Sequence, residues 1–158
     1  MKMKKWIEIG YLMVLGMSLG LVLTLGALVA PVVFHADLYS GVDLSHYQMG
    51  LIMTEIFKRS GYVLNVVAII IILREGYAYK SFERDVIVVP AAVTALLMIF
   101  LFTLYYTKAI IAYQQMGASI VSDPKFQALH KGSEIDFMLL ALSLALLLGR
   151  RLYLELKG

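Results

Sequence analysis

Four long runs of apolar residues, separated by short polar segments, organise the whole chain. The runs cover about residues 7–34, 51–73, 86–107 and 130–149, and an α-helix needs roughly 20 residues to cross a bilayer. None of the runs alternates apolar and polar positions as β-strands do. Because a helix satisfies all of its backbone polar groups internally, helix bundles are stable in lipid. The pattern therefore predicts an all-α, four-helix transmembrane bundle forming one domain over residues 1–158.

Local signals place several helix ends. Pro31 is expected to end or kink the first helix, because proline lacks the backbone N–H that continues a helix. Ser45 and Gln48 have the spacing of a capping box, which predicts the start of the second helix. Asp123 followed by Pro124 is typical of a helix N-cap with proline at the first helical position. This pair predicts the start of the fourth helix.

The first apolar run also carries Gly16 and Gly20 in the GxxxG spacing. Two glycines four residues apart leave a helix face on which another helix backbone can approach closely. We expect this face to pack inside the bundle. The same motif would also permit a homo-oligomer without requiring one.

Composition supports a membrane class. Apolar residues make up 61% of the chain and charged residues only 16%, and the mean hydropathy is +0.82. A soluble chain of this length could not bury so much apolar surface. The absence of cysteine excludes disulfides, iron-sulfur clusters and cysteine nucleophiles. No run of basic residues suggests nucleic-acid binding, although the net charge is +3.

The positions of the basic residues predict orientation. Nine of them fall on the side that carries both chain ends, namely Lys2, Lys4, Lys5, Arg74, Lys80, Arg84, Arg150, Arg151 and Lys157. Because cytoplasmic loops of membrane proteins carry an excess of lysine and arginine, we expect the N and C termini to be cytoplasmic. The chain is predicted to be a multi-pass protein of a bacterial inner (cytoplasmic) membrane.

Charged residues also lie near membrane depth in the outer half, where they would be costly unless paired or hydrated. Three are basic and three are acidic, so their formal charges cancel. One interpretation is an interior network of ion pairs between helices, and the other is a water-exposed helix rim. The residues concerned are Glu55, Lys58, Arg59, Lys108, Glu134 and Asp136.

All three histidines fall on the predicted outer side. His130 and Glu134 are four residues apart, so the carboxylate could orient the imidazole or bind a cation with it. Imidazole together with thioether sulfur suits Cu(I), although methionines at helical spacing are more often packing residues. The candidate metal ligands are His130, Glu134, His46, His35, Met49 and Met53.

Several short motifs resemble a known family. They are Ala30 to Phe34 closing a glycine-rich span, Gly50 and Phe57 in the second run, and Phe126, Leu129, His130 and Ser133 opening the fourth. On these residues the chain resembles the uncharacterised four-span proteins called domain of unknown function 4149, related to eukaryotic transmembrane protein 205. The resemblance implies distant kinship with copper-resistance D-type proteins and with the membrane protoporphyrinogen oxidase of haem synthesis. It carries no activity with it.

Three functions remain open at this stage. The first is binding or passage of a small cation, copper being the best guess, at an outer polar pocket. The second is a haem- or quinone-linked oxidoreductase, although no histidine lies in the middle of a span. The third is a structural or assembly subunit of a membrane complex. A non-enzymatic role is favoured, and the predicted partners are the lipid bilayer and a second copy or another membrane protein.

Overall fold

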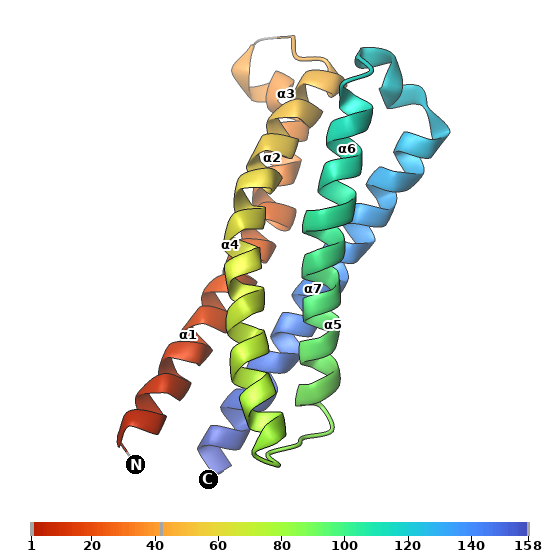
Figure 1. Cartoon of the computed structure of the whole chain (residues 1–158). Coiled ribbons are helices and arrows are strands. Elements are labelled where there is room, and N and C mark those ends of the chain that lie inside the picture. Colours follow the sequence, from red (N-terminus) through yellow and green to blue (C-terminus); the bar gives the residue numbers. More distant parts are fainter. Residues whose placement is uncertain (1, 42, 158) are drawn as a thin grey trace.

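A computed structural model describes residues 2–41 and 43–157. It contains four helical spans long and apolar enough to cross a membrane, Lys5–Phe34, His46–Lys80, Val88–Gln114 and Pro124–Lys157. The spans pack side by side as a bundle (Figure 1). The predicted all-α bundle of four membrane helices is therefore confirmed.

The first span is built from three consecutive segments, α1 (Lys2–Leu23), the π-helical η1 (Thr24–Val29) and α2 (Ala30–Phe34). The helix continues through Pro31 for one further turn and ends at Phe34, close to the predicted position. The wider π-helical turn lies just before the proline, where the regular ladder of hydrogen bonds must change. A short helix, α3 (Ala36–Ser40), follows in the first loop.

The second span is one uninterrupted helix, α4 (His46–Lys80). Its predicted capping box is present, because the Gln48 backbone N–H donates to Ser45 Oγ at 3.3 Å and the Ser45 backbone N–H donates to Gln48 Oε1 at 2.9 Å. These two bonds satisfy amides that the first turn of a helix leaves free. At the other end α4 continues beyond the apolar run to Lys80.

The third span consists of α5 (Val88–Phe100), the π-helical η2 (Leu101–Tyr106) and α6 (Thr107–Gln114). A short 3₁₀ helix, η3 (Ala118–Ser122), leads to the fourth span, α7 (Pro124–Lys157). The predicted start of α7 is confirmed, since Asp123 Oδ1 accepts the Lys125 backbone N–H at 2.7 Å.

Large aliphatic side chains fill the centre of the bundle. Leu15, Ile71, Ile99, Leu140 and Leu144 are among those with no exposed surface. Lipid tails are as apolar as leucine, so close packing rather than escape from water holds such helices together.

The glycine pair in α1 does not lie where it was predicted. A Cβ atom added at Gly16 or at Gly20 would meet nothing within 4 Å. The buried face of α1 is instead formed by Tyr11, Leu15 and Val22. Within the single chain these large side chains, and not the glycines, fill the space between α1 and its neighbours. Close approach of a second chain to the glycine pair stays a prediction.

Both termini lie at one end of the bundle, together with the connection between α4 and α5 (Figure 1). The short helix α3 and the start of α7 lie at the opposite end. An even number of crossings requires this arrangement. We call the end that carries the termini the inner end and the opposite end the outer end.

Candidate functional site

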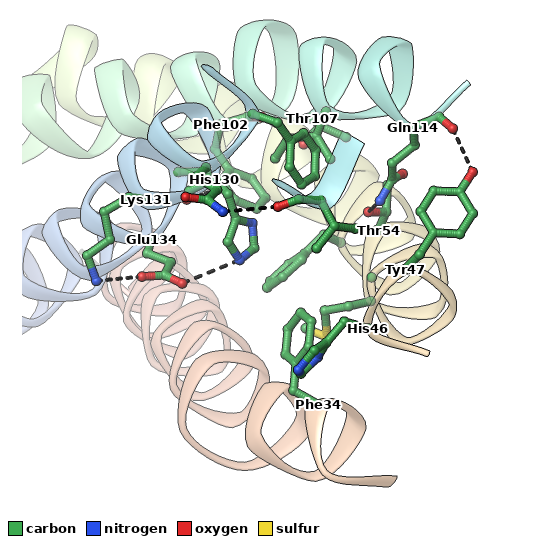
Figure 2. A pocket seen from close by; sticks show the side chains of 18 residues that line it. Phe34, His46, Tyr47, Thr54, Phe102, Thr107, Gln114, His130, Lys131 and Glu134 are labelled. Carbon is green, nitrogen blue, oxygen red and sulfur yellow. Dashed lines mark hydrogen bonds and ion pairs between the residues drawn. The ribbon is translucent and has the colours of Figure 1, made fainter. Parts of the chain in front are cut away.

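A cavity of about 420 Å³ opens at the outer end of the bundle (Figure 2). All four spans contribute to its walls, through Phe34 of α2, several residues of α4, Phe102 of η2, Gln114 of α6 and His130 of α7. The cavity thus gathers residues that are almost one hundred positions apart in the sequence.

Aromatic rings form much of the cavity wall. Phe34, Phe57, Phe102 and Phe126 all line it. Phe57 and Phe102 meet edge to face, with 5.3 Å between ring centroids, and both also pack against Phe137 beneath the cavity at 5.2 and 4.8 Å. Such contacts fix the orientation of large rings. The floor of the cavity is therefore apolar and formed by closely packed rings.

His130 stands on the α7 side of the cavity (Figure 2). Its Nε2 lies 3.4 Å from Glu134 Oε1, one helical turn away, as their spacing predicts. Glu134 Oε2 in turn accepts from Lys131 Nζ at 2.8 Å. The Phe126 ring is stacked against the imidazole with an interplanar angle of 10°, and Phe34 meets it edge-on. Three neighbours, Glu134, Phe126 and Phe34, thus contact the imidazole directly.

Hydrogen bonds between α4 and α6 fix the opposite wall. Gln114 Nε2 donates to Thr54 Oγ1 at 2.9 Å, and Tyr47 Oη donates to the Gln114 carbonyl oxygen at 2.6 Å. Gln114 is buried. Thr107 Oγ1 donates to the Phe102 carbonyl oxygen at 2.7 Å, where the π-helical segment passes into α6. The polar groups of this wall are held by the protein before any ligand binds.

The structure brings together four of the six predicted metal ligands. His46, Met53, His130 and Glu134 all line the cavity. Among residues 2–41 and 43–157, however, no three histidine, cysteine, aspartate or glutamate side chains are arranged to hold a metal ion. Metal binding stays a prediction.

The other two predicted ligands lie apart from the cavity lining. His35 Nδ1 is 2.7 Å from the Pro31 carbonyl oxygen at the end of α2. Met49 is a buried packing residue of α4. Met49 and Met53 lie four residues apart on one face of α4. That face extends beyond the cavity, so Met53 lines the cavity and Met49 does not.

Among the described residues, the charged side chains of the outer half form ion pairs within single helices, and not the network between helices that was one of the two interpretations of the sequence. Glu55 pairs with Lys58 at 3.1 Å and with Arg59 at 2.9 Å, all on α4, and these side chains are 46–77% exposed. Lys108 is exposed on α6. Residues three and four apart neutralise each other within one helix turn, so no partner on another helix is needed. Asp136, by contrast, is buried.

A network of buried ion pairs lies instead at the inner end. Glu8 of α1 and Arg74 of α4 approach to 2.6 Å. Glu75 of α4 pairs with Arg151 of α7 and also accepts a hydrogen bond from Tyr11 Oη at 2.7 Å. The four charged side chains are only 8–11% exposed. Their charges cancel, and they join α1, α4 and α7.

A further ion pair links the loop between α4 and α5 to α7. Arg150 Nη2 lies 2.7 Å from Asp85 Oδ2, and Arg150 Nε is 3.1 Å from both carboxylate oxygens. Asp85 Oδ1 also accepts the backbone N–H groups of Ile87 and Val88 at the start of α5. The Arg150 guanidinium and these amides hold the pKa of Asp85 well below its usual range.

Sequence reasoning used the inner arginines only as markers of orientation and missed these pairs. A signal was present, because Glu8, Glu75 and Asp85 lie beside the basic residues at the inner boundary. A second cavity of about 320 Å³ adjoins the network and is lined by charged residues, including Glu8, Arg74 and Arg151. Unlike the outer cavity, it has few apolar walls.

Comparison with known proteins identifies a family. No curated protein and no solved structure matches the chain. The domain of unknown function DUF4149 matches residues 13–119, which is more than half of the 158 residues and includes the second and third spans. The match ends before α7, which begins at Pro124. The chain therefore belongs to the DUF4149 family of domains of unknown function.

Proposed function

We propose that this membrane protein binds a small, largely apolar organic ligand in the outer cavity. The observation that carries the proposal is the cavity itself, whose volume of about 420 Å³ falls within the roughly 300–1,000 Å³ of small-molecule sites. Such sites combine mostly apolar and aromatic walls with a few fixed polar groups. Four phenylalanines and the hydrogen-bonded Thr54 and Gln114 fit that description.

The charge of the cavity favours a neutral ligand. Its lining contains one lysine and one glutamate, Lys131 and Glu134, and these two neutralise each other. A planar ring with carbonyl oxygens, such as a quinone head group, would stack on the phenylalanines and accept hydrogen bonds from imidazole or amide groups. The proposal thus extends the quinone alternative raised by the sequence to ligand binding, without assigning an electron-transfer reaction.

Copper as cargo is the second candidate, because His46, Met53 and His130 line the same cavity. Two imidazoles and a thioether are suitable ligands for Cu(I). The three side chains would have to converge on the ion, since the cavity is far larger than one ion and no preassembled group of histidine and carboxylate ligands is found among the described residues.

The orientation of the protein in the membrane determines which side the cavity faces. The excess of basic residues at the inner end supports placing both termini in the cytoplasm of a bacterial cell. The outer cavity would then face the periplasmic side of the inner membrane.

Binding of a short-chain benzoquinone to the protein in detergent, measured by isothermal titration calorimetry, tests the first candidate. The variant Gly50→Leu places a side chain into the cavity, since a Cβ there has only Gln114 Nε2 at 3.7 Å. The matched control is Gly149→Leu, at a glycine with open space near the inner end. We expect at least a tenfold loss of affinity in Gly50→Leu and none in the control. Equal binding by all three proteins, or by none, would overturn this candidate.

Elemental analysis and visible absorption of the same preparations test the second candidate and haem. Copper bound stoichiometrically by the wild type and lost in His130→Ala and Met53→Leu would support copper as cargo. Wild-type protein without copper after exposure to Cu(I) would reject a tight copper site. A haem spectrum lost in His130→Ala would reject both candidates in favour of a haem protein.

A further inference from the structure

Asp136 is a carboxyl group buried in the outer half of the bundle. It is 4% exposed, and neither carboxylate oxygen has accessible surface or a hydrogen-bond partner. It lies on the buried face of α7, between Ser133 and Leu140. Polar side chains in the interior of a membrane bundle normally find a partner, so an unpartnered carboxyl group requires an explanation.

The position of Asp136 is just below the outer cavity. Ser133, one turn earlier on α7, lines the cavity, and the adjacent Phe137 packs against the cavity rings Phe57 and Phe102. On the inner side the next turns of this face are closed by leucines with no exposed surface, including Leu140 and Leu144. The carboxyl group therefore lies between the cavity floor and the apolar centre of the bundle.

The third span packs closely against this part of α7. The π-helical segment η2 contacts α7, and Tyr106 at its end approaches Gly132 so closely that a Cβ there would be 2.9 Å from Tyr106 Oη. Gly132 precedes Asp136 by one helical turn. π-Helical turns within α-helices are found frequently at functional sites.

No positive charge compensates Asp136. The titratable groups on the other elements packed against the outer half of α7 are Tyr105 and Tyr106 of η2 and Lys108 and Tyr113 of α6, while α7 itself carries Lys125, His130, Lys131 and Glu134. Glu134 pairs with His130 and Lys131, and Glu55 pairs with Lys58 and Arg59, the two cations in the outer half of α4. None of these described groups is hydrogen-bonded to Asp136. An ionised carboxylate without partner or water is strongly unfavourable in such surroundings.

We propose that Asp136 is a proton-binding site within the membrane, occupied by a proton at neutral pH while the bundle has this conformation. Protonation removes the charge, and the neutral acid is compatible with an apolar setting. Ionisation would release the proton when water reaches the carboxylate, which requires the helices around it to move apart. Membrane-buried acids of this kind serve proton relays and proton-linked carriers. This proposal rests on the burial of Asp136 and on the lack of a hydrogen-bond partner for either of its oxygens, and it is tested on protein treated with a chelator, so that no bound cation can compensate the carboxylate.

Infrared spectroscopy of protein labelled with carboxyl-¹³C aspartate tests the proposal. The chain has five aspartates. Asp37 and Asp43 are exposed, Asp123 caps α7, and Asp85 is paired with Arg150, so none of these four is buried without a partner as Asp136 is. We therefore expect the C=O stretch of one protonated, labelled carboxyl group per chain at pH 7, contributed by Asp136 alone.

Two variants assign the signal. Asp136→Asn, nearly isosteric with the neutral acid, should lack the band, and Asp37→Asn should keep it at full intensity. A wild-type spectrum at pH 7 without a protonated aspartate would overturn the proposal even if Asp136→Asn failed to fold. Persistence of the band in a folded Asp136→Asn protein would overturn it as well.

Discussion

Asp85 combines two roles in one side chain. Its Oδ1 atom caps the start of α5 by accepting two backbone N–H groups, and its charge binds Arg150 of α7. Exposed pairs contribute little to stability, but this one is bidentate and joins residues 65 positions apart. The carboxylate therefore holds the loop between α4 and α5 against the last span.

Replacing this charge should have a pH-dependent effect. In Asp85→Asn the amide oxygen can still cap α5, whereas the ion pair is lost. Because Arg150 and the cap amides lower the pKa of Asp85 in the folded state, the carboxylate stabilises the fold above its ordinary pKa of about 3.9. That contribution is lost as the pH falls below this value toward the folded-state pKa. We expect the variant to melt about 2–4 °C below the wild type at pH 7, with a smaller difference at pH 3.

Thermal unfolding in detergent, followed by circular dichroism at pH 7, 5 and 3, checks this expectation. Asp37→Asn, at an exposed position, is the matched control and should melt like the wild type throughout. A difference between Asp85→Asn and wild type that stays constant or grows toward pH 3 would contradict the assigned role.

Residue pairs show where sequence reasoning succeeds. The contact between His130 and Glu134 was predictable, because a spacing of four fixes two residues on one face of a helix whatever its surroundings. The pair of Glu8 and Arg74 was not, since the rotation of α1 against α4 decides which carboxylate reaches which arginine. For the same reason Asp136 was assigned to a network that its helix face does not meet.

At the scale of whole elements, the apolar runs were sufficient to find four helices, and capping residues placed the starts of α4 and α7. The π-helical segments η1 and η2 were not predicted. One extra residue in a turn leaves the apolar pattern of a membrane helix almost unchanged, so hydropathy carries no signal for it. These segments nevertheless shape the outer half, because Phe102 of η2 lines the cavity.

The contact between η2 and α7 depends on Gly132. A Cβ there would lie 2.9 Å from Tyr106 Oη and 3.0 Å from Tyr106 Cε1, closer than packed atoms tolerate. We expect Gly132→Ala to destabilise the protein by about 1–3 kcal/mol through overpacking, despite the higher helix propensity of alanine. In a Tyr106→Ala background the same substitution should cost nothing or stabilise, because the obstructing ring is gone.

Reversible unfolding in mixed micelles can compare the two backgrounds directly. Gly16→Ala serves as the control, since a Cβ at that glycine meets nothing within 4 Å of it. It should be neutral or slightly stabilising. If Gly132→Ala had the same effect with and without the Tyr106 ring, the close approach of η2 to α7 would not be what fixes residue 132 as glycine.

For the whole molecule, the two ends of the bundle differ in chemistry. The inner end buries the neutralised ion pairs that join α1, α4 and α7, whereas the outer end opens into an aromatic cavity with an unpartnered acid below it. Separating these helices at the inner end would break the buried ion pairs that join them, although a second cavity adjoins the network. We infer that motion of the spans, where function requires it, takes place at the outer end.

The orientation of these two ends can be tested because the chain contains no cysteine, so that any introduced thiol is the sole target of a membrane-impermeant maleimide. With both termini in the cytoplasm, Ser119→Cys in η3 should be labelled in intact cells, and Ser81→Cys after α4 only in permeabilised cells. Leu144→Cys, at a fully buried position, should stay unlabelled in both. The reverse pattern would place the cavity on the cytoplasmic side, and labelling of positions 81 and 119 from the same side would contradict the arrangement of the four spans.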